Sequence, residues 1–280
     1  WSKVRFDECV DKLRPFLKQC GFKIKTQVKF LALSGLSGAN IKEVVPASVC
    51  PWWHELVARG DNNTAESTLI DLLDKLPLDH RDATAPLRVP VLDRYVDRGT
   101  MALGKVEQGV LETGQRVLIM PTRQEIKVEA IFINDRKVRT AKPGENVTIK
   151  LSCGEADIIK GFVLCDPKRP AKASKRFLTK IFLAELLESR PLLTAGYDAV
   201  FHGHTCEEEC VITDLLSAEV KGKVQKRPRF VKPGVYVNAV IEVERSICVE
   251  KYKDTMALGR FTLRTEGHTI AIGMILEVKE

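Results

Sequence analysis

The sequence predicts a mainly β protein in which two consecutive closed β-barrels follow a smaller α/β region. Three observations support this fold class. Helical spacing of apolar residues is limited to the first 80 residues, short alternating runs with glycine or proline turns occupy the remainder, and a basic, proline-containing bridge over 167–176 divides that remainder in two. We therefore expect domains over 1–80, 85–169 and 174–280.

The first region combines helical and extended patterns. Apolar residues three to four positions apart predict an amphipathic helix over 1–20, and a helix with a capping hydroxyl is predicted over 67–76. A short apolar run over 28–33 predicts a strand that enters a small-residue loop at 34–40. Residues 46–66, with two prolines and a polar run, are expected to be irregular. This succession is typical of an α/β domain.

The β-rich remainder shows period-two alternation, which predicts half-buried strands at 118–120, 126–133 and 147–151 of the first barrel. Closing such strands into a barrel removes the exposed edges that promote aggregation. Glycines punctuate the second barrel between its expected strands, which are Phe177–Leu187, Asp198–Cys206, Glu209–Leu216, Val235–Val243 and Thr269–Val278. Extensive helix in this part of the chain would contradict the prediction.

The composition is that of a soluble globular protein with a mild basic excess. Of the 280 residues, 44% are hydrophobic and 29% charged, the formal net charge is +7, and no window is long and apolar enough to span a membrane. The basic excess fits contact with RNA or an acidic partner, and solubility alone explains it equally well. Eight cysteines without short repeated spacing predict reduced thiols in a cytoplasmic protein rather than a disulfide framework. Because the sequence starts at Trp1, we expect it to be part of a longer chain.

Sequence motifs that bind nucleotide phosphates are absent. The sequence contains no Gly-x-x-x-x-Gly-Lys-Ser/Thr, no Asp-x-x-Gly and no Asn-Lys-x-Asp. We therefore expect no GTP hydrolysis by this chain alone and assign no catalytic residue. By residue type alone, Ser34, Gly35 and Leu36 form a plain strand-to-helix turn.

One cluster of possible metal ligands consists of His202, His204 and Cys206, with Cys210 nearby. On a strand, the first three would share one face and lie along a line, whereas zinc in proteins prefers a tetrahedral arrangement. No Cys-x-x-Cys pair occurs elsewhere in the sequence. A packed strand is the favoured interpretation, and we expect no metal site.

The most distinctive pattern is an arginine-flanked strand that a glycine turn closes. Alternation predicts Phe261 and Leu263 in the core, whereas Arg260, Thr262 and Arg264 share the opposite face. Two guanidinium groups on one face could hold the carboxylates of a partner protein. Taken alone, a hairpin with no binding role is the favoured interpretation.

A basic tract lies between the expected strands of the second barrel and includes Lys221, Lys223, Lys226, Arg227 and Arg229. These cations could contact RNA phosphates, and a solvated loop explains them equally well. The tract therefore predicts at most a weak RNA contact over 221–229.

Several motifs resemble the translational GTPase family of elongation factor Tu. Residues 89–109, with their Val-Pro-Val and Gly-Lys-Val segments, are similar to the start of the family's second domain, and Gly259-Arg260-Phe261 with Thr269–Gly273 resembles the end of its third domain. Phe6–Cys9 and Pro15–Lys18 match the helix that follows the family's Asn-Lys-x-Asp motif. The first region is thereby identified as the C-terminal part of a P-loop GTPase (G) domain.

Within this family, several segments resemble eukaryotic release factor three, the GTP-binding subunit of the peptide chain release factor. They are Cys50–Trp52, Cys165–Pro167, His204–Glu208, Arg227–Lys232 and Glu266–Gly273, whereas Gly259–Arg264 is similar both to release factor three and to the ribosome-rescue GTPase. The sequence departs from this subfamily at Thr265, where aspartate is usual, and in a longer stretch at 61–67. The alternatives are the ribosome-rescue GTPase of the same family and an aminoacyl-tRNA carrier like elongation factor one-alpha.

The resemblance implies a role in translation termination on the ribosome. Domains 2 and 3 would dock the stop-codon-reading class I release factor, and the contact motif would be Arg260, Phe261, Thr262, Leu263 and Arg264. Ser34, Gly35 and Leu36 match the loop that contacts guanine in the family. GTP with Mg²⁺ would serve the complete protein, and no cofactor is expected for this chain alone.

Overall fold

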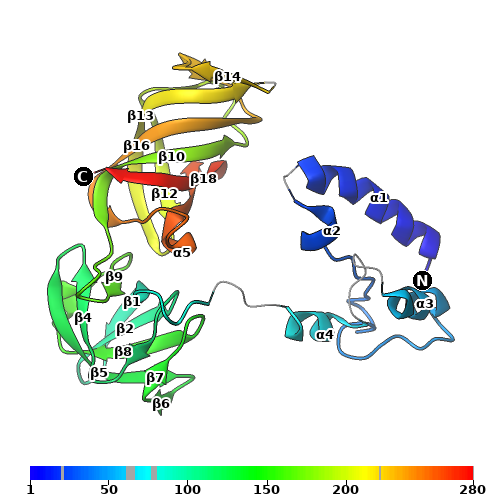
Figure 1. Ribbon diagram of the computed structural model, residues 1–280, viewed down its shortest axis with the longest axis horizontal. Coiled ribbons are helices and arrows are strands. Elements are labelled where there is room, and N and C mark those ends of the chain that lie inside the picture. The colour runs from blue at the N-terminus through cyan, green and yellow to red at the C-terminus, as the bar shows by residue number, and fades with distance from the viewer. Residues whose placement is uncertain (20–21, 61–66, 77–80, 221, 280) are drawn as a thin grey trace. The chain divides into compact units, whose positions relative to one another are not determined.

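The computed structural model describes residues 1–19, 22–60, 67–76, 81–220 and 222–279 (Figure 1). The chain divides into two compact units, Trp1–Asp79 and His80–Glu280. The first unit is helical, and the second contains both β-barrels. No helix in the described part of the chain is long and apolar enough to cross a membrane.

The first unit packs its helices around a small aromatic core. Its described elements are α1 (Lys3–Gln19), α2 (Ile24–Gln27), α3 (Pro51–Arg59) and α4 (Leu69–Asp74). Trp53 is fully buried, and its ring centroid lies 6.1 Å from that of Phe6 on α1. The Thr68 hydroxyl caps α4 by accepting a hydrogen bond from the Asp71 amide at 3.1 Å. The helices predicted over 1–20 and 67–76 are thus confirmed.

Two predictions for the first unit are wrong. Residues 28–33 form no named strand: Phe30 takes part in an isolated β-bridge, and no ladder between described residues includes this segment. Residues 51–59 are helical rather than irregular. Pro51 occupies the first turn, where its missing N–H costs nothing, and Gly60 ends the helix in the left-handed conformation (φ 63°). The polar run at 61–66 lies outside the described residues.

The first barrel closes through six strands. The ring runs β4-β9-β1-β2-β8-β5, and pairing of β4 with β5 completes it. Alternate residues of β5 and β8 point into the core. The half-buried strands predicted at 126–133 and 147–151 are therefore confirmed. The elements are β1 (Arg88–Val96), β2 (Thr100–Lys105), β3 (Leu111–Glu112), β4 (Arg116–Met120), β5 (Gln124–Ile133), β6 (Arg136–Val138), β7 (Thr140–Ala141), β8 (Asn146–Leu151), a 3-10 turn (Glu155–Asp157) and β9 (Val163–Cys165).

The second barrel also closes through six strands, in the order β12-β17-β18-β10-β16-β13, and the β12–β13 pair completes the ring. Strand β14 extends the sheet beyond β13. The predicted mainly β fold with two closed barrels is confirmed. The elements are β10 (Ala173–Leu183), β11 (Leu193–Thr194), β12 (Tyr197–Gly203), β13 (Cys206–Val220), β14 (Lys223–Lys226), β15 (Phe230–Val231), β16 (Val235–Cys248), α5 (Met256–Gly259), β17 (Arg260–Thr265) and β18 (His268–Lys279).

The turn between β12 and β13 differs from the prediction, which placed it in the acidic run after Cys206. Gly203 pairs with Cys206, so the two turn residues are His204 and Thr205. His204 adopts a positive φ of 35°, as tight hairpin turns require. The acidic residues 207–209 therefore belong to β13, where they pair with residues 200–202 of β12.

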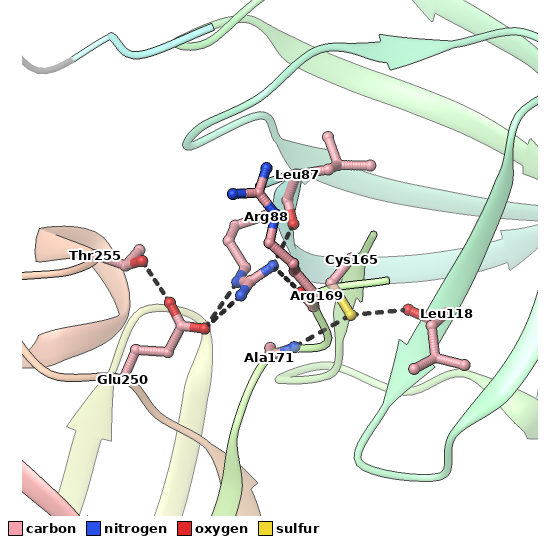
Figure 2. A network of polar contacts seen from close by, with 8 residues as sticks. All are labelled: Leu87, Arg88, Leu118, Cys165, Arg169, Ala171, Glu250 and Thr255. Atoms are coloured by element: carbon pink, nitrogen blue, oxygen red, sulfur yellow. Dashed lines mark hydrogen bonds and ion pairs between the residues drawn. The ribbon is translucent and has the colours of Figure 1, made fainter. Parts of the chain in front are cut away.

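A buried ion pair joins the two barrels (Figure 2). Arg88 of β1 donates from Nε and Nη2 to Oε1 of Glu250, at 2.9 and 2.7 Å, and Glu250 also accepts a hydrogen bond from Thr255. The Nη1 atom of Arg88 donates to the carbonyls of Leu87 and Arg169. Both charged side chains are less than a tenth exposed, and apolar residues of both barrels surround them. Each buried charge is therefore paired, as a low-dielectric environment demands.

Candidate functional site

Strand β17 places its side chains on two faces. Phe261 and Leu263 are buried in the core of the second barrel, whereas Arg260 and Arg264 are exposed and Thr262 is half-buried. This alternation is the predicted one. The Arg264 guanidinium donates from Nη2 to the carbonyl of Gly267 at 2.6 Å, which holds it over the closing turn.

The aromatic core beneath this strand depends on two glycines, which leave space for its rings. The Phe261 ring stacks on Phe201 with centroids 4.8 Å apart. A Cβ atom at Gly273 would lie 2.4 Å from Phe261 Cζ, and one at Gly203 would lie 2.6 Å from Phe201 Cε1, which is closer than real Cβ contacts allow. These two glycines thus make room for the rings that hold β17 in place.

The start of β17 depends on a close backbone approach. A Cβ atom at Gly259 would lie 2.4 Å from the Cα of Tyr252, so only glycine fits immediately before Arg260. The Tyr252 amide in turn donates a hydrogen bond to the carbonyl of Ile275 on β18. The Gly-Arg-Phe sequence therefore combines a glycine that permits the approach, an exposed arginine and a phenylalanine anchored in the core.

Neighbouring strands extend the exposed side of β17. The register pairs Thr262 with Ile272 of β18, and Arg260 with Met274. Ile272 is 56% exposed although it is a large apolar residue. We call Arg260, Thr262, Arg264, Ile272 and Met274 the motif face. It consists of an apolar centre with a guanidinium group on either side, which is the usual make-up of a protein-binding patch.

A groove between the barrels adjoins the motif face. Its volume is about 770 Å³, and both barrels contribute to its lining. Leu92 and Phe132 line it from the first barrel, and Arg260, Thr262 and Ile272 line it from the second. Leu92 is 55% exposed because β1 bulges between Val91 and Asp93, which turns this apolar side chain outward. Sequence reasoning missed Leu92 and Ile272, since neither position differs in residue type from a core position.

Several acidic residues lie beside the Arg264 end of the motif face. Asp198, Glu209, Glu242 and Glu266 line a hollow that also contains Arg264. Arg190 neutralises Asp198 through an ion pair of 3.2 Å. The Thr265 hydroxyl, where the related sequences are expected to carry aspartate, is buried without a hydrogen-bond partner. Arg264 therefore lies beside acidic side chains, whereas Arg260 lines the groove between the barrels.

The loop with Ser34, Gly35 and Leu36 lies in the first unit. The Ser34 hydroxyl accepts a hydrogen bond from the Ser37 amide, and the Leu36 side chain is fully exposed. Asn40 holds the far end of the loop, since its buried side chain donates to the Ala32 carbonyl and accepts from the Val45 amide, both at 2.8 Å. No motif singles out Asn40, whose role depends on contacts formed only in the folded unit. A contact of this loop with guanine stays a prediction.

The cluster of possible zinc ligands is separated by the β12–β13 turn. His204 Nε2 donates a hydrogen bond to the carbonyl of Cys248 at 2.9 Å, and burial lowers the pKa of His204 to about 4. Burial raises the pKa of the Cys206 and Cys210 thiols to about 12, so neither is a thiolate near neutral pH. Among the described residues, no group of three His, Cys, Asp or Glu side chains is placed to hold a metal ion.

Both barrels match known domain families. The family model for elongation factor Tu domain 2 matches residues 99–165, and the GTP-eEF1A C-terminal domain-like model matches residues 176–276. The crystal structure of sup35 complexed with GDP is similar to this chain with a TM-score of 0.68 and 34% identity, and the match covers 100% of this chain and 66% of that one.

Curated relatives are similar along nearly the whole chain. The eukaryotic peptide chain release factor GTP-binding subunits of Kluyveromyces lactis and Zygosaccharomyces rouxii are each 38% identical over 100% of this chain, and that of Schizosaccharomyces pombe is 34% identical over 99%. These matches cover 39%, 41% and 40% of the relatives. The chain thus spans about two fifths of the length of the curated relatives it matches.

Proposed function

Because the chain belongs to the family of eukaryotic peptide chain release factor GTP-binding subunits, we propose that it works in translation termination. Its two barrels, domains 2 and 3 of a translational GTPase, dock the class I release factor that reads the stop codon. The docked factor is coupled to GTP hydrolysis by a G domain on the ribosome, in the cytoplasm.

The observation that carries the docking role is the composition of the motif face. Arg260 and Arg264 are exposed, and no carboxylate in the described residues forms an ion pair with either of them. Ile272 lies between them with 56% of its surface exposed. Exposed arginine beside an apolar centre is enriched at protein interfaces, where guanidinium groups pair with carboxylates. Phe261 and Leu263 support this face from the core and do not touch the partner directly.

The nucleotide belongs to the complete protein. GTP with Mg²⁺ is bound by phosphate motifs that this sequence lacks, and Ser34, Gly35 and Leu36 supply the contact with guanine. The exposure of Leu36 and the tight turn at Ser34 fit a loop that presents its backbone to a planar ligand. We expect the chain alone to show no saturable binding of GTP, which nucleotide titration will test.

Calorimetric titration of the chain with a purified stop-codon-reading release factor tests the docking role. Binding at micromolar concentration without nucleotide is expected, and its absence, while the complete protein binds, would contradict it. The variant Arg260→Glu/Arg264→Glu should weaken binding at least about tenfold, because interface arginines dominate affinity and reversed charges repel. The matched variant Arg136→Glu/Arg139→Glu alters exposed arginines of the first barrel and should bind normally.

The two alternatives within the family predict different partners in the same assay. A ribosome-rescue GTPase would bind a rescue factor and not the stop-codon reader. An aminoacyl-tRNA carrier like elongation factor one-alpha would bind tRNA tightly with a steep salt dependence. A weak RNA contact through residues 221–229 fits any of the three, because all of them work on the ribosome.

A further inference from the structure

A concentration of unpaired cations lies at the end of the second barrel, on β14 and the loop after it. Lys223, Lys226, Arg227, Arg229 and Lys232 fall within ten consecutive residues, and all are exposed. No ion pair or side-chain hydrogen bond joins any of them to a carboxylate in the described part of the chain. We call these residues, together with Phe230, the basic loop.

Three arginines elsewhere on the same barrel are neutralised locally by ion pairs. Arg176 pairs with Asp214 at 3.0 Å, Arg190 with Asp198 at 3.2 Å, and Arg245 with Glu208 at 2.8 Å. The basic loop lacks such partners, so its charges add rather than cancel. A surface of one sign attracts a ligand of the opposite sign over several ångströms.

Phe230 gives this surface an aromatic ring that the barrel does not cover. Its side chain is 51% exposed, while the next residue, Val231, is buried in the core. Pairing of β15 with β11 places Phe230 opposite Thr194 and fixes its backbone. Pro228 is buried as well, which anchors the loop between Arg227 and Arg229. The ring is therefore held outward by a fixed backbone rather than exposed by a loose loop.

Protection of an exposed sheet edge explains only part of this pattern. Lysines on an edge strand prevent pairing with other chains, and that role accounts for Lys223 and Lys226 on β14. It does not account for the cations beyond the strand or for the exposed ring beside them. Arg227 adopts a φ of 44°, a conformation that residues other than glycine rarely take, and this turns the chain sharply between the two groups of cations.

The basic loop lies far from the motif face around the barrel. Successive paired residues trace one path across the sheet from β17 to β14. The path passes through β18, β10, β16 and β13, and its residues in order are Arg260, Met274, Lys180, Asn238, Ser217 and Lys226. Along this path five strand spacings, or roughly 24 Å, separate the two ends. In the other direction around the closed ring only β12 and β13 intervene, but Cys206, which pairs with Gly203 beside β17, lies eleven residues along β13 from Ser217, or roughly 36 Å. The two surfaces can therefore be altered independently, and two different partners can occupy them at once.

We propose that the basic loop binds single-stranded RNA. Its five cations contact phosphates on both sides of the edge strand β14, because Lys223 and Lys226 point to opposite faces of it, and a base stacks on the Phe230 ring. RNA is favoured over an acidic protein because a single strand offers both regularly spaced phosphates and a free base face, whereas carboxylates alone leave the exposed ring without a role. This inference rests on the proposed function, because a factor that works on the ribosome meets RNA there.

Fluorescence anisotropy of a labelled oligouridine of about 15 nucleotides, titrated with the 280-residue chain, tests the inference. Five phosphate contacts predict a slope of about −3.5 for log K against log salt concentration, since each contributes about −0.7 on a single strand. Affinity should fall about 100-fold between about 50 and 200 mM salt. A slope near zero, or no binding at the lower salt concentration, would overturn the proposal.

Neutralising variants locate the site. Lys223→Gln/Lys226→Gln/Arg229→Gln should reduce the magnitude of the slope by about 2, because three contacts are lost. The matched variant Lys12→Gln/Lys25→Gln/Lys42→Gln removes the same charge from exposed lysines of the first unit and should keep the original slope. If both variants lower affinity equally, net charge rather than the basic loop binds the RNA, and the assignment is wrong.

The aromatic contact has a separate signature. Phe230→Ala should weaken binding about 5- to 100-fold and leave the salt slope unchanged, since stacking involves no counterion. Duplex RNA of the same length should bind less tightly than the single strand, because its bases are not free to stack. Equal affinity for the duplex, or unchanged binding by Phe230→Ala with an unaltered melting temperature, would overturn the single-strand assignment.

Titration with the release factor separates this inference from the proposed function. The basic-loop variant should bind the release factor normally, and Arg260→Glu/Arg264→Glu should bind oligouridine normally. Loss of release-factor binding in the basic-loop variant, with RNA binding intact, would identify the loop as a protein contact and contradict the proposal. Normal RNA binding by a chain that fails to bind the release factor would contradict the docking role alone.

Discussion

The junction between the barrels and the motif face use the same residue type in opposite ways. At the junction, Arg88 is 4% exposed, and Glu250 and two backbone carbonyls satisfy its guanidinium. On the motif face, Arg260 and Arg264 are exposed and without carboxylate partners among the described residues. A paired, buried arginine fixes the position of one barrel against the other, whereas an unpaired, exposed one is available to a partner. The environment of each arginine, rather than its residue type, therefore decides whether it stabilises the fold or is available to bind a partner.

The largest effect is expected at the junction. Glu250→Ala leaves the Arg88 guanidinium buried and unpaired, and this should lower the free energy of unfolding by about 3–5 kcal/mol. Urea denaturation measures it. Glu125→Ala is the matched control, because it removes the carboxylate of an exposed pair with Arg116, and should cost less than about 1 kcal/mol. Equal losses in the two variants would break the comparison.

A double substitution separates two contributions to the loss of stability: the cost of leaving a charge buried without a partner, and the loss of the ion pair itself. Arg88→Met/Glu250→Leu should recover most of the loss in Glu250→Ala, because no unpaired charge remains at the junction. If the double variant is as unstable as the single one, packing or specificity rather than charge burial is the important property of this pair.

A smaller effect is expected from pH, again at the edge of the junction. Burial lowers the pKa of His204 to about 4 from an ordinary 6.5, although the bond with the Cys248 carbonyl opposes the shift. Between these values the unfolded chain binds a proton that the folded chain does not, so stability should fall as pH drops from about 6.5 to about 4, by up to about 3 kcal/mol.

The variant His204→Asn tests this assignment, since asparagine tolerates the positive φ of the turn. Its free energy of unfolding should vary less with pH in that interval, as urea denaturation at several pH values will show. His268→Asn, at an exposed position, is the control and should keep the slope of the unmodified chain. An unchanged slope in His204→Asn would exclude this imidazole as the cause.

A third effect lies beneath the motif face. Gly273→Ala places a methyl group 2.4 Å from the Phe261 ring and 2.8 Å from Ile181, and such overpacking should cost about 1–3 kcal/mol. Gly35→Ala introduces the same methyl group into open space without a positive φ and should change stability little. Equal melting temperatures for these two variants would show that the rings beneath β17 rearrange freely.

The smallest effect on stability is expected on the motif face itself. Arg260→Glu/Arg264→Glu should change the free energy of unfolding by less than about 1 kcal/mol, because both positions are exposed and the only side-chain hydrogen bond lost among the described residues is that of Arg264 to the Gly267 carbonyl. Thermal unfolding will measure it. A large loss of stability would mean that these arginines support the fold, as Arg88 does, and the contrast between the two regions would disappear.

Sequence reasoning succeeded where the information is local and failed where an element depends on its neighbours. The alternation of Arg260, Phe261 and Leu263 gave their faces correctly, because a strand has a period of two. The expected strand at 28–33 failed because strand formation needs a pairing partner. The irregular structure predicted around Pro51 is wrong because proline fits the first turn of a helix well. For the site, the arginines were predictable, and the exposure of Ile272 and Leu92 was not.

The sequence by itself determined the mainly β class, the two barrels and the two faces of β17, because periodicity and turn residues act over a few positions. The tertiary structure decided how the barrels join. Arg88 and Glu250 are 162 residues apart in the chain, and nothing near either residue indicates the other. Which charges become buried and paired, and which stay exposed for a partner, depends on surfaces that come together only when the chain folds.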